Sequence, residues 1–205
     1  MRIDKLIIKD FKNFKNFEID FDETQMTTVL IGHNGTGKSN LIEALVIIFR
    51  NLDLAKAPQF SYDLTYIIKD YKININADPQ ERMHTRIMIN GKEIKLSNFY
   101  ENKSEYLPNN IFTYYSGPSN RLESHFNEHQ KRFYEDLLKG KDKPLRPFFY
   151  ARNVHSQFVL LSYFSFPDKE STKFLEDYLN ISSLESILFI LKKPPWKSKE
   201  GDSRF

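Results

Sequence analysis

Eight residues of the chain, at positions 32–39, have the types and spacing that phosphate binding requires. They read GHNGTGKS and fit the pattern GxxxxGK[ST], in which a glycine-rich loop leads into a lysine and a hydroxyl residue. Glycines lack a Cβ atom, so the backbone N–H groups of such a loop can converge on phosphate oxygens. Lys38 would contact the β- and γ-phosphates of a nucleotide, and the Ser39 hydroxyl would bind the Mg²⁺ that bridges them.

The residues on both sides of this motif predict the elements that must position it. An apolar, β-branched run at 29–31 predicts a strand, and the apolar residues of 41–49 are typical of a buried helix. The helix would begin near Lys38 and direct its partly positive N-terminus at the phosphates. This order of strand, loop and helix argues against a chance glycine-rich turn. The residues predicted to bind nucleotide are Gly32, His33, Asn34, Gly35, Thr36, Gly37, Lys38, Ser39 and Asn40.

The composition is that of a folded protein. The chain has 205 residues, of which 40% are hydrophobic and 15% aromatic, which argues against disorder. A net charge of +3 permits a nucleic-acid partner without requiring one. Without cysteine there is no disulfide framework and no thiolate metal site, which suits a reducing cytoplasm. No apolar run is long enough to predict export or a membrane span, so we expect a cytoplasmic protein.

Hydrophobic periodicity predicts the other elements. Strands are expected at 3–8, 17–22, 62–68, 71–75, 85–89, 93–96, 111–115 and 187–191. Asn90-Gly91 predicts a hairpin turn between two of these strands. Helices are expected from about residue 120 to 138, ended by Gly140, and at 174–179. The apolar segment 154–166 ends at Pro167, and a charged tail follows at 192–205.

The first fifty residues, roughly, resemble a known family. The sequence IIKDFKNF, an acidic-alternating strand and TVLIGHNGTGKSNLIEAL are similar to the N-terminus of the SMC/RecF group of ABC-type, AAA-family ATPases. The resemblance implies an α/β P-loop NTPase fold, with a mixed sheet around the P-loop helix and an antiparallel β patch beside it. It further implies an incomplete ATPase domain, divided into a P-loop core at 1–50, the β patch at 60–97 and a remaining α/β segment at 111–205.

The resemblance also implies roles for residues outside the loop. In the group, an aromatic-basic pair after the first strand lies beside the nucleotide, and Phe11 and Lys12 match it. Lysine stands where arginine is usual and lacks the planar fork, so a plain surface lysine is the alternative. In the group, the strand after the β patch usually ends at a glutamine that touches Mg²⁺ and the attacking water; Ser116 is the nearest candidate here, and a Gly-Pro turn without a catalytic role is the preferred alternative.

Several parts of an ABC-type ATPase head are missing from the sequence. We find no apolar strand ending in Asp-Glu, no serine-glycine signature and no switch histidine. Residues 159–168 come nearest to the strand ending in Asp-Glu. The GTPase discriminator NKxD is also absent, which favours ATP over GTP. We therefore expect an ATPase that is complete only as a dimeric head with further C-terminal elements, and that is nearly inactive as this piece alone. A nucleotide-binding regulatory module that does not hydrolyse ATP is the alternative.

The resemblance implies ATP-dependent self-association and work on DNA. The sequence YYSGPSNRLE at 114–123 also resembles ATPases of bacterial anti-phage or restriction-associated systems, which implies an effector nuclease as partner.

A remote alternative is a zinc peptidase, because residues 125–129 fit HxxEH, in which two histidines bind zinc. The sequence identifies none of the downstream acids Glu170, Glu176 and Glu185 as the third ligand.

Overall fold

The structure is a computed structural model that describes residues 1–117, 119–141, 146–188 and 190. It contains two compact units, Met1–Ala151 and Arg152–Phe205. The mixture of helices and strands confirms the predicted α/β class. The tail predicted at 192–205 lies outside the described residues. None of the helices in the described ranges has the length and apolar character that crossing a bilayer requires.

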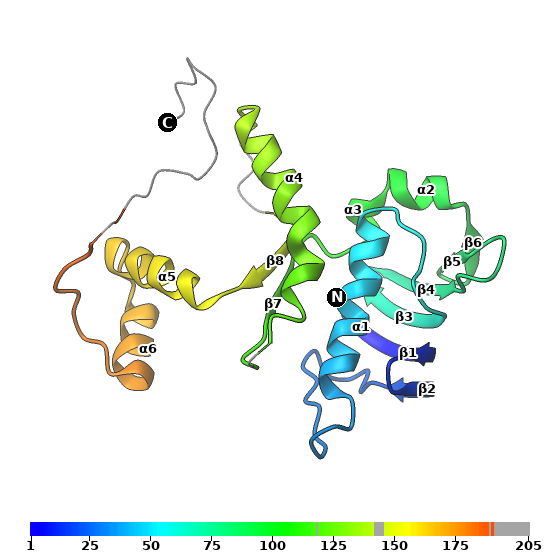
Figure 1. The fold of residues 1–205 in the computed structure, drawn as a ribbon, viewed down its shortest axis with the longest axis horizontal. Helices are drawn as coiled ribbons and strands as arrows, with labels where there is room; N and C mark the ends of the chain where they lie inside the picture. Colours follow the sequence, from blue (N-terminus) through cyan, green and yellow to red (C-terminus); the bar gives the residue numbers. More distant parts are fainter. Residues whose placement is uncertain (118, 142–145, 189, 191–205) are drawn as a thin grey trace. The chain divides into compact units, whose positions relative to one another are not determined.

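Six antiparallel strands form the main sheet of the first unit (Figure 1). They are β1 (Arg2–Phe11), β2 (Phe14–Asp20), β3 (Tyr62–Ile68), β4 (Tyr71–Ala77), β5 (Thr85–Ile89) and β6 (Lys92–Ile94). Their order is β2-β1-β3-β4-β5-β6, so the pairing of β1 with β3 joins the two N-terminal strands to the predicted antiparallel patch. The hairpin predicted at Asn90 and Gly91 is present, with positive φ angles of 49° and 78°.

The helix α1 (Lys38–Asp53) packs against this sheet and closes the core (Figure 1). Its apolar residues recur at helical spacing, so Leu41, Ala44 and Ile48 are buried together on one face. Phe49 meets Tyr66 of β3 edge to face, with ring centroids 5.5 Å apart. The predicted phosphate-loop helix is therefore confirmed, and its burial fixes the loop at its N-terminus.

The rest of the first unit is a series of short elements. They are α2 (Leu96–Glu101), α3 (Lys103–Tyr106), β7 (Ile111–Tyr114), η1 (Glu123–Phe126), α4 (Asn127–Leu138) and β8 (Phe148–Ala151). The strands β7 and β8 form a separate two-stranded parallel sheet, and η1 and α4 together make the helix expected from residue 120. That helix stops before Gly140, whose φ of 74° favours glycine.

The second unit contains two helices in its described part. They are α5 (Asn153–Ser165), formed by the apolar segment before Pro167, and α6 (Lys169–Leu179). Asp168 caps α6 by accepting hydrogen bonds from the backbone N–H groups of Glu170 and Ser171.

Two predicted strands are wrong. Residues 27–31 are irregular in the structure, with Val29 76% and Ile31 92% exposed. A strand needs a neighbour to pair its N–H and C=O groups, and in the described part this segment is paired into neither sheet. Of the strand predicted at 187–191, residues 187, 188 and 190 are also irregular, and 189 and 191 lie outside the described residues. Apolar β-branched residues signalled both strands, but pairing decides whether a strand forms.

A matched pair of isoleucines tests this correction. Ile48→Ala should lower the free energy of unfolding by about 2–5 kcal/mol, because it empties a buried site in the core. Ile31→Ala should change it by less than about 0.5 kcal/mol, because the side chain already meets solvent. Urea unfolding followed by circular dichroism measures both, and an Ile31→Ala loss as large as that of Ile48→Ala would show that residues 27–31 are packed.

Candidate functional site

Residues 32–37 form a loop whose conformation depends on glycine. Gly35 and Gly37 have φ angles of 85° and 103°, in the left-handed region. At Gly37 a Cβ atom would lie 2.8 Å from both Asn13 Nδ2 and Phe14 Cε1. A larger residue there would have to displace the side chains of Asn13 and Phe14, so the loop is packed closely against these two residues.

The loop is closed by hydrogen bonds to its own carbonyl groups. Lys38 Nζ donates to the carbonyl oxygens of Gly32 and His33, at 2.6 and 2.8 Å. Thr36 Oγ1 donates to the same His33 carbonyl at 2.9 Å. Carbonyl groups are neutral acceptors, and a phosphate oxygen would be a stronger, charged acceptor for the same ammonium group.

A cavity of 310 Å³ opens on the loop and the first turn of α1. Its lining residues are Asn34, Gly35, Gly37, Lys38, Ser39, Asn40 and Arg121. Most of the predicted nucleotide-binding residues are thus brought together. Gly32, His33 and Thr36 belong to the loop but do not line the cavity.

The two predicted residues outside the loop are placed differently. Lys12 adopts a left-handed φ of 55° in the turn after β1, and its Nζ donates to Glu43 Oε1 of α1 at 2.5 Å. It therefore lies beside the loop helix and contributes to an ion pair. Ser116 is exposed, two residues beyond the end of β7, and is not among the residues that line the cavity.

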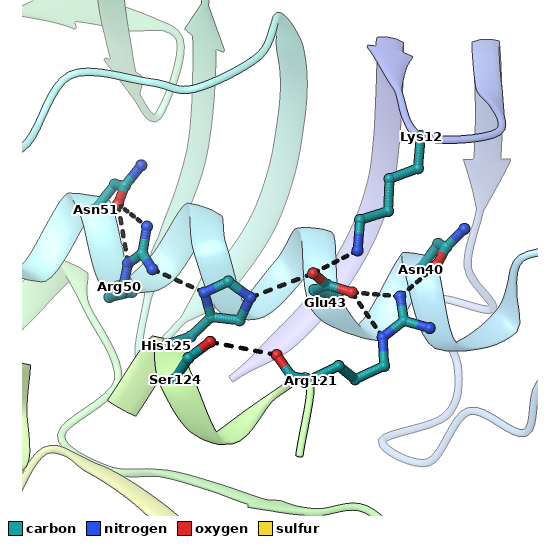
Figure 2. Close-up of polar contacts among 8 residues, drawn as sticks. All are labelled: Lys12, Asn40, Glu43, Arg50, Asn51, Arg121, Ser124 and His125. Carbon is teal, nitrogen blue, oxygen red and sulfur yellow. Dashed lines mark hydrogen bonds and ion pairs between the residues drawn. The ribbon is translucent and has the colours of Figure 1, made fainter. Parts of the chain in front are cut away.

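A buried carboxylate, that of Glu43, is bonded by three residues from two segments of the chain (Figure 2). Besides Lys12, it accepts hydrogen bonds from Arg121 Nε at 2.9 Å and from Arg121 Nη2. His125 Nε2 lies 3.3 Å from Glu43 Oε1. Burial acts to raise the pKa of Glu43, but hydrogen bonds from Lys12, Arg121 and His125 outweigh it and leave the pKa below its ordinary value. Glu43 is therefore ionised at neutral pH.

The tautomer of His125 follows from its partners. Arg50 Nη1 lies 2.9 Å from His125 Nδ1, and a guanidinium can only donate (Figure 2). The Nδ1 atom is therefore the acceptor, and the Nε2–H group donates to Glu43. Burial, opposed by the hydrogen bond to Glu43, and the charge of Arg50 together lower the pKa of His125 from its ordinary value of 6.5.

The zinc alternative is wrong, because each residue of the HxxEH pattern already binds protein groups. His125 is occupied by Arg50 and Glu43, and His129 Nε2 lies 2.8 Å from Asp53 Oδ2. Glu128 pairs with Lys56 and Arg132. Within the residues that the structure describes, no three metal-ligating side chains are grouped to hold a metal ion. The two histidines instead join the η1–α4 segment to α1 through their contacts with Arg50, Glu43 and Asp53.

Sequence reasoning missed Arg121, which lines the cavity, and the tertiary contacts of Glu43 and His125 behind the cavity wall. Arg121 and His125 meet Glu43 across separations of 78 and 82 positions, which no local pattern reveals. Glu43 and Arg121 do lie inside the two segments whose sequences resemble known ATPases, and that was the available signal.

The neutral state of His125 predicts a pH dependence. Because its folded pKa is below 6.5, the stability that it contributes is complete above pH 6.5 and is lost as the pH falls through the folded value. Between about pH 7.5 and about pH 5.5, the wild-type protein should lose more free energy of unfolding than His125→Gln, which cannot titrate. Urea unfolding at the two pH values measures the difference, and equal losses would contradict a neutral His125.

Comparisons with known proteins identify the family of the chain. The model of the AAA ATPase domain family matches residues 1–193. The chain is 32% identical over 117 residues to the DNA replication and repair protein RecF of Oenococcus oeni, covering 53% of this chain and 30% of that protein. RecF of Rickettsia canadensis is 40% identical over 52 residues, or 25% of this chain and 14% of that protein.

A solved structure from work on ATP-driven dimerization and DNA-stimulated activation of SMC ATPases is also similar. It covers 66% of this chain and 98% of its own, at 19% identity and a TM-score of 0.37. The family match covers all the described residues and 193 of the 205 positions. The chain therefore belongs to the AAA ATPase domain family, and part of it is similar to RecF proteins.

Proposed function

We propose that the chain binds Mg-ATP in the cavity at the phosphate loop. The observation that carries the proposal is the conformation of the loop. Lys38, at the N-terminus of α1, donates hydrogen bonds to the carbonyl oxygens of Gly32 and His33. The loop presents backbone groups, an ammonium group and a helix N-terminus to one cavity, which together suit a polyphosphate. Membership of an ATPase family supports the choice of ligand.

The donor set in the cavity fits both parts of this ligand. Gly35 lines the cavity, and nothing lies within 4 Å of the position that a Cβ atom would take there, which leaves room for an anion close to the backbone. Ser39, at the start of α1, would hold the Mg²⁺ ion through its hydroxyl oxygen. The bound ion would neutralise phosphate charge. Lys38 would exchange its carbonyl acceptors for phosphate oxygens, and Asn34, Gly35 and Asn40 would line the remaining wall.

Hydrolysis requires more than these residues. Phosphoryl transfer to water needs an oriented nucleophile, and none of the residues that line the cavity is a carboxylate. Ser116 in the water-contacting position and Lys12 as a phosphate contact remain predictions. We infer that this 205-residue chain alone turns ATP over slowly, and that a dimeric head with further elements completes the enzyme. The absence of a lining carboxylate equally favours the alternative, a regulatory module that binds ATP without hydrolysing it.

The proposed setting is work on DNA through an ATP-dependent dimer. RecF relatives carry the name of DNA replication and repair proteins, and a net charge of +3 is compatible with a nucleic-acid partner. The chain spans only 30% of the Oenococcus protein. Dimerisation and action on DNA are therefore proposals, which the geometry of the site does not carry. A cytoplasmic location and a role in phage defence with an effector nuclease remain predictions from the sequence.

Lys38→Ala tests the proposed binding. The substitution should lower the affinity for Mg-ATP by about 100-fold or more, because it removes the ammonium group that would contact two phosphates. Isothermal titration calorimetry measures the affinity, and the melting temperature should be nearly unchanged because Lys38 bonds only to exposed loop carbonyls.

Lys69→Ala is the matched control, since Lys69 also donates to a carbonyl oxygen, that of Ser104, but does not line the cavity. It should bind Mg-ATP as the wild-type protein does. A folded Lys38→Ala protein with undiminished affinity would reject the assignment.

A further inference from the structure

Arg121 reaches the phosphate-loop cavity from outside the sequence motif. It lies between β7 and η1, yet lines the cavity together with Lys38, and these two are its cationic lining residues. The side chain is 28% exposed, so it borders solvent on one side and the protein on the other.

One edge of the Arg121 guanidinium is held by the protein. Its Nε and Nη2 atoms both donate to Glu43 Oε2, and Nη2 also donates to Asn40 Oδ1. The Asn40 amide is itself oriented, because its Nδ2 donates to Asn13 Oδ1 at 2.5 Å. Figure 2 shows the third nitrogen, Nη1, directed away from Glu43, and it has no hydrogen-bond partner among the described residues. The Arg121 guanidinium therefore keeps its Nη1 donors free on the side away from Glu43.

The charge balance indicates that Arg121 does more than neutralise Glu43. The carboxylate already receives Lys12 Nζ at 2.5 Å and the Nε2–H group of His125. A buried carboxylate needs one compensating cation, and Lys12 supplies it. Arg121 then adds positive charge at the wall of a cavity suited to an anion, and a guanidinium is well matched to phosphate oxygens.

We propose that Arg121 is a phosphate-binding residue of this cavity, positioned by Glu43 and Asn40. Its ligand is the polyphosphate of Mg-ATP, so the inference rests on the proposed function. Lys38 and Arg121 would then meet the polyphosphate from two separate segments.

The experiment compares Arg121 with His125, which also bonds the Glu43 carboxylate. His125 bonds the same carboxylate from the same segment but does not line the cavity, so His125→Gln loosens the tie and leaves the cavity wall intact. Titration calorimetry with Mg-ATP, and with magnesium and inorganic tripolyphosphate, should show affinities about ten-fold or more lower for Arg121→Ala. His125→Gln should remain within about two-fold of the wild-type protein. Arg121→Gln, which keeps a polar side chain but no charge, should lose affinity as Arg121→Ala does.

The outcomes separate this inference from the proposed function. Wild-type affinity in folded Arg121→Ala or Arg121→Gln, with binding still lost in Lys38→Ala, would make Arg121 a structural tie only and overturn the inference. Equal losses in the Arg121 variants and in His125→Gln would do the same. If Arg121→Ala does not fold, Arg121→Gln decides. No Mg-ATP binding by the wild-type protein would overturn both proposals.

Discussion

The buried carboxylate of Glu43 is the interaction on which the site depends. A charge that is removed from water must be compensated, and here the compensation comes from the turn after β1 and from the segment around η1. Since Glu43 lies in the second turn of α1, these partners are drawn to the helix whose N-terminus carries the phosphate loop. The requirement to pair one carboxylate thus assembles, around the loop, residues that are far apart in sequence.

The parts of the fold that the sequence predicted are those with strong local signals. The two-residue alternation of β3 and the Asn90-Gly91 turn identified the antiparallel patch, and the apolar spacing after Lys38 identified α1. Residues 29–31 carried an apolar, β-branched signal but form no strand. The difference is physical, because a hairpin brings its own pairing partner, whereas a strand before a phosphate loop depends on distant segments.

The site divides in the same way. The loop residues were predictable because phosphate binding requires glycines at fixed spacing. Packing adds a second requirement at Gly37, since a Cβ there would collide with Asn13 and Phe14. Glu43, Arg121 and His125 were not predictable, because each takes its role from a tertiary contact. Residues 125–129 show the opposite error: their spacing resembled a metal site, but Arg50, Glu43 and Asp53 bind the two imidazole rings.

The central claim is that the cavity at residues 32–39 receives a polyphosphate in place of the carbonyl groups that Lys38 now binds. A crystal structure with Mg²⁺ and a non-hydrolysable ATP analogue tests it most directly. The account predicts the β- and γ-phosphates within hydrogen-bonding distance of the loop N–H groups, with Lys38 Nζ moved from the Gly32 and His33 carbonyl oxygens to phosphate oxygens. An analogue bound elsewhere, with the bonds from Lys38 to those carbonyl groups intact, would contradict it.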